Sequence, residues 1–474
     1  MEEHHDYHPV CTSAFPIPTD SAALGDPGRR AALRRSGTIT NAAAPTIVRE
    51  IGGGEGLVKW LGASYALALG ALLVVGGRLG DKYGKRKIFL IGLAGFTLES
   101  LICGLAADPA MLVGARFVQG AFGALLIPQG ISILLGSLNR EQMPTAFSMF
   151  GPVLGASAVL GPIAAGFIIH ANIAGLTWRP MFLINIVLGT IGLIAAARIL
   201  PHDAPSDDQP IDGVGAGVLS VTMLGFIFGF IDGSTSGWTA LPIVSLIVGA
   251  IGLVAFWMRQ RTSKNPLIIP TLLTNRGFTA GLLLGLAYFA AVNGFAYVIS
   301  LFFQLQLGMS ALQASLGLSP LMVGIIVASF IARPLIPKLG RALVVYGLIV
   351  TLAGAIALFA AVLVVGSGIS AWGTAPAILV LGIGMGACFS SIYDVAIGDV
   401  AAEEAGSASG SLSAVQQLAA AIGSAVVTTI YFSQAAAHDG IHAVVVSVGV
   451  VGAIVVLCLA LVWLLPKHAH EEQH

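Results

Sequence analysis

The chain has 474 residues, of which 56% are hydrophobic and 10% are charged, and its formal net charge at pH 7 is zero. A soluble domain carries about 25% charged residues, so this composition excludes a soluble globular protein and indicates a polytopic membrane protein. The mean hydropathy of +0.90 agrees with that class. Apolar segments of about 20 residues recur between short polar breaks, which favours membrane-spanning helices over the weaker alternation of a β-barrel.

Residues 1–37 do not follow this pattern. They hold four arginines, four prolines, three histidines and no apolar run. A signal peptide needs an apolar segment after its charges, so we expect a disordered cytoplasmic tail here instead. The cluster His4-His5-x-x-His8 is not expected to bind a metal.

An apolar stretch of about 14 residues begins at Gly37 or Thr38, and it is too short to span a bilayer. It also contains Asn41, Pro45 and Arg49. From residue 58 onward the pattern is regular and predicts thirteen full spans. Their approximate bounds are 58–79, 86–106, 110–136, 144–170, 179–200, 211–232, 240–260, 278–305, 313–335, 342–366, 374–398, 407–432 and 442–465.

The segment Gly77-Arg78-Leu79-Gly80-Asp81-Lys82-Tyr83-Gly84-Lys85-Arg86-Lys87 is predicted to be a compact charged turn between two spans. Its charges cannot lie in hydrocarbon, and its cations mark the cytoplasmic face. The three glycines would let the two helix ends approach closely.

Placing this segment inside puts ten further cations inside as well and the C-terminus in the cytoplasm. The outer loops after residue 36 hold only Arg49, Lys59 and Arg179. The ten inner cations are Arg140, Arg198, Arg259, Arg261, Lys264, Arg276, Arg333, Lys338, Arg341 and Lys467.

A weak internal repeat indicates two halves. Lys82-Tyr83-Gly84-Lys85 has a counterpart in Lys338-Leu339-Gly340-Arg341, where Pro337 replaces the acid. Parallel repeats about an axis along the membrane normal are one way in which transporters are built. The spans at 211–260 lie between the halves, after the short polar linker His202–Pro210.

The sequence offers no sign of a cofactor or of enzyme chemistry. Cys11, Cys103, Cys388 and Cys458 are scattered and form no CxxC, so neither a disulfide framework nor a zinc site is predicted. The phosphate-binding pattern G-x-x-x-x-G-K-[ST] does not occur, so any transport must draw on a gradient. We expect no nucleic-acid partner.

The charged segment at 77–87 resembles the signature loop that joins helices 2 and 3 in the major facilitator superfamily. Within that superfamily the chain is similar to the fourteen-helix drug:proton antiporters. Three further stretches carry this resemblance: Thr38–Ile47 is similar to the second half of helix 1, Trp178–Asn185 to the start of helix 6, and Gly406–Gln417 to a later helix start. Trp178 and Arg179 are expected to anchor the outer interface.

The resemblance implies an all-α integral membrane protein of the major facilitator fold. Two pseudo-symmetric six-helix halves would be joined by two extra central helices, and the first helix would be truncated or degenerate. The implied domains are 1–37 as a non-matching segment, 38–205 and 263–465 as the two halves, 206–262 as the inserted pair, and 466–474 as a cytoplasmic tail.

The short first helix has two explanations. Members of the subfamily place an Asp inside an apolar run just upstream of Thr38, and Ser36 stands at that position here. A frameshift or misassigned start would have replaced the original N-terminus, which we favour, or the protein works with a degenerate first helix.

The resemblance assigns the 77–87 segment as a charge latch that holds the outward-open state. Asp81 would face the surrounding cations, and a purely topological anchor is the alternative. The latch residues are Gly77, Arg78, Gly80, Asp81, Lys82, Gly84 and Arg86.

Four residues are candidates for proton coupling. Arg116 in the 110–136 span would cost at least about 2.5–3.5 kcal/mol to bury, so it should face a partner or a wet cavity, with Gln119 on its face of the helix. It resembles the superfamily's proton-coupling arginine, and snorkelling to the interface is the alternative. Glu99 is a candidate proton carrier that the subfamily does not support, and Asp394 is another.

The 144–170 span carries a stripe of glycines with one proline, which by itself also suits close helix packing. It resembles the antiporter motif of proton-driven exporters, through Gly155, Gly161, Pro162 and Gly166. Asn293 and Gln304 are candidates for the substrate path, with polar helix contacts as the alternative.

The function that this resemblance implies is proton-coupled antiport. The protein would export a small amphipathic drug or antibiotic, which could be cationic, across the cell membrane by alternating access. The proton would be the coupling ion, with no other cofactor, and the chain would act as a multi-pass monomer in the lipid bilayer. The alternative is a non-transporting or sensor-like membrane protein, or the inactive product of a gene with a disrupted N-terminus.

Overall fold

The computed structural model describes residues 46–48, 50–137, 164, 167–168, 171, 175–201, 211–309, 311–397, 400 and 404–465. Helices and their connections account for this part of the chain, which contains no strand. Twelve of its helices are long and apolar enough to cross a membrane. They correspond to twelve of the thirteen expected spans; the remaining span, at 144–170, lies mostly outside the described residues.

The long helices of the first part of the chain are α2 (Gly54–Tyr83), α3 (Lys85–Gly104), α4 (Pro109–Ser137) and α6 (Pro180–Ile199). A hairpin of α7 (Gly213–Ser236) and α8 (Ala240–Thr262) follows. The last part holds α10 (Arg276–Leu301), α12 (Ser319–Ala332), α14 (Arg341–Val365), α15 (Ala371–Ile397), α16 (Ala405–Ala437) and α17 (Gly440–Leu461). Shorter pieces are α9 (Pro270–Thr274), η2 (Phe302–Gln306), α11 (Ala311–Gly317), α13 (Ile336–Leu339), η3 (Gly366–Gly368) and η4 (Val462–Leu464).

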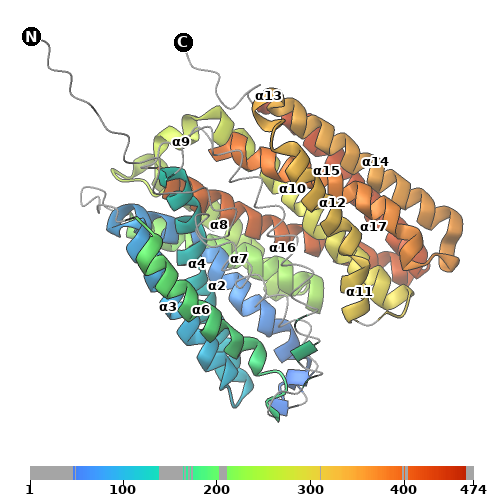
Figure 1. Ribbon diagram of the computed structural model, residues 1–474, viewed down its shortest axis with the longest axis horizontal. Helices are drawn as coiled ribbons and strands as arrows, with labels where there is room; N and C mark the ends of the chain where they lie inside the picture. The colour runs from blue at the N-terminus through green and yellow to red at the C-terminus, as the bar shows by residue number, and fades with distance from the viewer. Residues whose placement is uncertain are drawn as a thin grey trace, which may run out of the picture.

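The helices gather into two bundles (Figure 1). One contains α2, α3, α4 and α6, and the other contains α10, α12, α14, α15 and α17. Helix α16 packs on α10 and α17 of the second bundle and also on α2 and α4 of the first. It therefore contributes to joining the two bundles.

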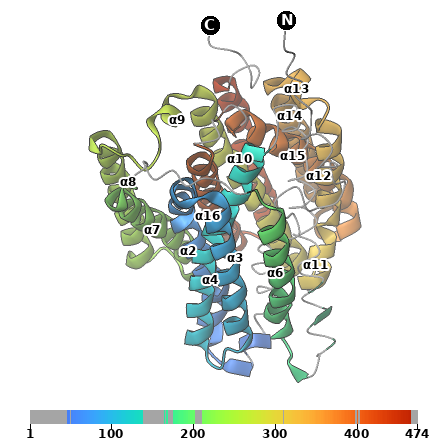
Figure 2. The ribbon, with the colours of Figure 1, turned by 60° about the vertical axis from the view of Figure 1, so that its left-hand side comes forward.

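The α7–α8 hairpin lies at the side of the molecule, with α7 against both α2 and α16 (Figure 2). The Asp212 carboxylate accepts two hydrogen bonds from the Arg259 guanidinium, at 2.9 and 3.0 Å, and one from the backbone N–H of Gly215. These bonds, led by the one from Arg259, lower the pKa of Asp212 below its ordinary value. The Trp238 indole N–H donates to the Thr429 hydroxyl of α16 at 3.0 Å.

The described residues before α2 are helical at 46–48 and 50–51. Ile47 is fully buried in an apolar cluster that includes Leu61 of α2 and Trp178 before α6. Glu50 accepts hydrogen bonds from the side chains of Thr177 and Arg179. This short helical piece is thus packed against α2 and against the residues that precede α6.

Two expectations need correction here. The segment at 77–87 is almost wholly helical, because α2 continues to Tyr83 and α3 begins at Lys85. Gly84, with a φ of 94°, is the single residue between them, and a positive φ costs glycine little. Trp178 does not lie at an exposed interface either: it is fully buried and meets Phe182 edge to face.

Candidate functional site

The end of α2 carries a carboxylate that binds the start of α16. The Asp81 carboxylate accepts the backbone N–H of Gly406 through one oxygen and that of Ser407 through the other, each at 3.1 Å. The first N–H groups of a helix have no partner within the helix and form the positive end of its dipole. Asp81, only 8% exposed, therefore caps a helix that lies more than 300 residues later in the chain.

Glycines on both helices make this contact possible. A Cβ at Gly77 would lie 2.1 Å from the carbonyl oxygen of Gly406, and a Cβ at Gly406 would lie 2.2 Å from an oxygen of Asp81. A Cβ at Gly80 would lie 1.9 Å from Oε1 of Gln129 on α4. We expected these glycines to bring α2 and α3 together; Gly77 and Gly80 instead admit α16 and α4, and only Gly84 forms the α2–α3 connection.

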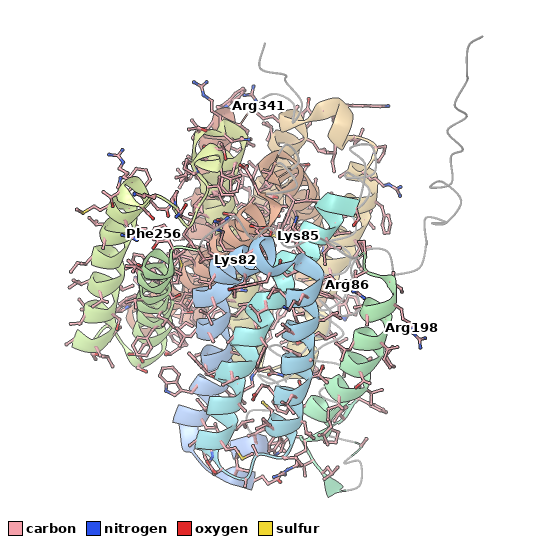
Figure 3. All side chains as sticks on the ribbon, turned by 90° about the vertical axis from the view of Figure 1, so that its left-hand side faces the viewer. Lys82, Lys85, Arg86, Arg198, Phe256 and Arg341 are labelled. Atoms are coloured by element: carbon pink, nitrogen blue, oxygen red, sulfur yellow. The ribbon has the colours of Figure 1, made fainter. Side chains whose placement is uncertain are left out.

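The cations of the segment differ in their surroundings. Arg78 is 5% exposed, and its guanidinium lies 4.0 Å from the Asp81 carboxylate. Arg86 donates to the backbone carbonyl of Ala197 at the end of α6. Figure 3 shows Lys82, Lys85 and Arg86 at one end of α2 and α3, and Arg198 on the adjoining α6. The Lys82 ammonium lies 5.2 Å from the centre of the Tyr83 ring.

Arg116 of α4 is fully buried. Its Nε donates to the backbone carbonyl of Leu61 on α2 at 3.1 Å, and Nη1 donates to Oε1 of Gln119 at 2.7 Å. Its guanidinium carbon lies 4.4 Å from the centre of the Tyr65 ring, within the range of a cation–π contact. Full burial argues against the alternative in which Arg116 reaches the membrane surface.

A hydrogen-bond chain continues from Arg116 to α3. The amide of Gln119 donates to the hydroxyl of Ser100 at 2.6 Å, and that hydroxyl donates to the Phe96 carbonyl at 3.0 Å. Glu99, half-buried, is the neighbour of Ser100 on α3. The structure thus brings Arg116 and Gln119 together as predicted and adds Ser100 and Tyr65, which sequence reasoning missed because no local pattern marks them.

The other predicted site residues are placed differently. The Asn293 amide donates to the Phe289 carbonyl of its own helix at 2.7 Å. Gln304 is exposed, and its amide donates to Ser300 one turn earlier. Asp394 belongs to α15, but its side chain lies outside the described part, as do Gly155, Gly161, Pro162 and Gly166.

An aromatic group between α10 and α15 was also missed by sequence reasoning. The ring of Phe289 meets those of Phe389 and Tyr393 edge to face, with centres 5.6 and 6.5 Å away. The Gln416 amide of α16 donates to the Tyr393 hydroxyl. Among the residues that the structure describes, no group of three or more His, Cys, Asp or Glu side chains could hold a metal ion.

Among the described residues, twelve helices of membrane-spanning length, a buried arginine network in the first bundle and a polar contact between that bundle and α16 define a multi-pass membrane protein. The family model described as Major Facilitator Superfamily matches residues 35–217 and 211–424. The chain belongs to the Major Facilitator Superfamily.

Several relatives are named for antibiotics. The chain is 38% identical over 401 residues to a "Probable actinorhodin transporter" of Streptomyces coelicolor, covering 84% of this chain and 69% of that protein. It is 29% identical over 452 residues to "Puromycin resistance protein pur8" of Streptomyces alboniger, covering 90% and 88%. It is 29% identical over 404 residues to "Tetracenomycin C resistance and export protein" of Streptomyces glaucescens, covering 84% and 73%.

Two solved structures share the fold. The human organic anion transporter MFSD10 superposes with a TM-score of 0.66 and 14% identity, covering 93% of this chain and 98% of that one. The proton:xylose symporter XylE gives a TM-score of 0.64 with 14% identity, covering 94% of each. At this identity the likeness supports the fold alone.

Proposed function

We propose that this protein is a proton-coupled antiporter that exports small amphipathic antibiotics or drugs across the cytoplasmic membrane by alternating access. The observation that carries the proposal is the bond between Asp81 and the start of α16, because it ties α2 of the first bundle to a helix that also packs in the second bundle. The names of the relatives, which speak of transport, resistance and export, support the substrate class.

In this proposal the end of α2 at Tyr83 faces the cytoplasm, together with the C-terminus. The cluster of Lys82, Lys85 and Arg86 at that end supports the orientation, since cations accumulate on cytoplasmic loops. The Asp81 contact would then close the inner side, as expected of an outward-facing state. Opening to the cytoplasm requires Asp81 to leave the N–H groups of Gly406 and Ser407.

The Arg116 network is the proposed proton-coupling element. Its guanidinium is held by Leu61 and Gln119 in a fully buried setting, where a charge interacts strongly with its surroundings. A nearby carboxyl group would then exchange its proton as substrate binds and leaves. Glu99, beside Ser100 at the end of the hydrogen-bond chain, is the first candidate for that carboxyl, and Asp394 is the second.

The proposed architecture is that of the fourteen-helix subfamily. Residues 38–205 and 263–465 would form the two halves, with a short first helix that includes the buried Ile47. Residues 206–262 would be the inserted pair, a role that the packing of α7 on both α2 and α16 supports. Four further features remain predictions. They are a cationic substrate, a monomeric state, the substrate path of Asn293 and Gln304, and the antiporter motif of Gly155, Gly161, Pro162 and Gly166.

Transport by everted membrane vesicles tests the proposal, because eversion turns efflux from the cell into uptake by the vesicle. Ethidium, puromycin and tetracenomycin C serve as probes, and respiration supplies the proton gradient. We expect efflux of at least one probe, its loss when an uncoupler removes the gradient, and a strong reduction in Arg116→Ala and in Asp81→Asn. Arg261→Ala is the matched control, because Arg261 is exposed over the Trp257 ring at the protein's edge. Unchanged efflux in both Arg116→Ala and Asp81→Asn would contradict the proposed mechanism.

A further inference from the structure

A second polar contact joins α4 and α16, one turn deeper than the Asp81 contact. The hydroxyls of Ser132 on α4 and Ser409 on α16 lie 3.2 Å apart, although 277 residues separate them in the chain. Both also reach the backbone carbonyl of Pro128, at 2.8 and 3.1 Å respectively. All of these groups are buried, and none carries a charge.

Pro128 and Gln129 fix α4 against α2 at the same level. Proline has no N–H, so the Ala124 carbonyl one turn earlier lacks its helical donor. That carbonyl lies against Gly76, where an added Cβ would be 2.2 Å from its oxygen. The Gln129 amide, fully buried, donates to the Gly76 carbonyl at 2.6 Å.

Gln129 also contacts the turn of α2 that carries the latch. Its Oε1 occupies the space where Gly80 has no side chain, and Gly80 is the neighbour of Asp81. The last turn of α2 is therefore held from one side by Gln129 and from the other by the start of α16. Movement of α16 away from the first bundle would break the contact with α16 and leave the contact between Gln129 and α2 in place.

We infer that Ser132, Ser409 and the Pro128 carbonyl form an uncharged clasp between the two halves, and that Gln129 is the residue that positions Asp81 for its contact with α16. The inference rests on the proposed alternating access. Helix α4 also carries Arg116, twelve residues before Pro128, which is about 18 Å along a helix that rises 1.5 Å per residue. One helix thus links the buried arginine to the inner closure.

The clasp differs from the Asp81 contact in that both partners are side chains, so both can be replaced by cysteine. Opening of the halves would part the two hydroxyls and expose them to water, whereas helices of one half stay together. A bond across Ser132 and Ser409 must therefore arrest the cycle.

Disulfide trapping tests the clasp. In a background without the four native cysteines, Ser132→Cys and Ser409→Cys are combined and oxidised in membrane vesicles, and free thiols are counted by mass spectrometry. We expect nearly complete cross-linking, loss of efflux on oxidation and recovery on reduction. Ser132→Cys with Ser411→Cys is the matched control, because two residues along α16 turn the side chain by about 200° from that of Ser409. This pair should stay reduced.

A second measurement tests Gln129 without any substrate. The single variant Ser409→Cys should react slowly with N-ethylmaleimide, and at least several-fold faster when Gln129→Leu is added, as it should with Asp81→Asn. A cross-link that leaves efflux unchanged, a failure of the pair to cross-link, or equal alkylation rates with and without Gln129→Leu would each overturn the inference. If the protein moves no probe at all, the proposed function fails, while cross-linking yield and alkylation still decide the clasp.

Discussion

The carboxylate of Asp81 and the backbone N–H of Gly406 lie 3.1 Å apart across 325 residues of chain. A helix start offers unpaired donors and a partial positive charge, so the bond depends on the charge of Asp81 as well as on its oxygen atoms. It is the kind of contact that can be made and broken as a unit when two bundles rock.

Asp81→Asn keeps the shape of the side chain but removes the charge. We expect the inner-closed state to lose about 1–2 kcal/mol, the upper range for a charge at a partly buried helix start, which is roughly a tenfold shift in population. Spin labels at Ile199 of α6 and Tyr346 of α14, both exposed, would report longer distances between the halves. Asp108→Asn is the control, because Asp108 caps its own helix α4 through Met111. An unchanged distance distribution in Asp81→Asn would contradict the latch.

Gly77→Ala places a methyl group 2.1 Å from the backbone oxygen of Gly406, which cannot move aside alone. Overpacking of this kind typically costs about 1–3 kcal/mol, and here it falls on the closed state only. We expect the same lengthening between the labels as for Asp81→Asn, together with slower efflux. Gly114→Ala on α4 adds the same methyl group to open space and should change neither. Equal label distances and equal efflux in the two alanine variants would show that close packing of α2 on α16 at Gly77 is not required.

Arg116→Lys keeps the charge but not the geometry. A lysine has no planar group with which to serve the Leu61 carbonyl and Gln119 together while lying over the Tyr65 ring. We expect efflux to fall more than about tenfold, equivalent to at least about 1.4 kcal/mol, with the protein still folded in the membrane. Arg261→Lys is the control, because Arg261 lies over the exposed Trp257 ring, and it should leave efflux nearly unchanged. Wild-type efflux in Arg116→Lys would show that charge alone suffices.

The Asp212–Arg259 pair gives a prediction about pH. The pKa of Asp212 is lowered in the folded protein, first by its bond from Arg259, so its stabilisation is fully present above the ordinary aspartate pKa and is lost as pH falls through the lowered value. Asp212→Asn preserves a helix cap for α7 and removes only the charge. The difference in melting temperature between wild type and variant should be constant near pH 7 and shrink below about pH 4. A difference that grows on acidification would contradict the ion pair.

The sequence was sufficient for the twelve spans that the structure describes, because apolar runs of about 20 residues have few other structures available in a bilayer. It was also sufficient for the pairing of Arg116 with Gln119, since residues three apart share a helix face. The partner of Asp81 could not be predicted, because no local spacing connects α2 with a helix start more than 300 residues later.

The absence of a local signal for contacts between distant helices also explains the wrong predictions around the charged segment at 77–87. Its charge and glycines suggested a loop, but helix α2 extends through Asp81 because the charges face a helix start and the molecular surface instead of hydrocarbon. Gly77 and Gly80 looked like turn residues, whereas they clear space for α16 and α4. Ser132, Ser409 and Gln129 carry no local signal at all, and only the packing of three helices gives them partners.

Gradient reversal in proteoliposomes tests whether transport by this protein is proton-coupled exchange. Purified protein is reconstituted, and the movement of whichever of ethidium, puromycin or tetracenomycin C the vesicles pump is followed under an imposed pH gradient. We predict that the compound accumulates on the acidic side, that reversing the gradient reverses its direction, and that Arg116→Ala abolishes both. Accumulation that does not change with the sign of the gradient, or that is equal in wild type and Arg116→Ala, would rule out proton-coupled exchange through Arg116.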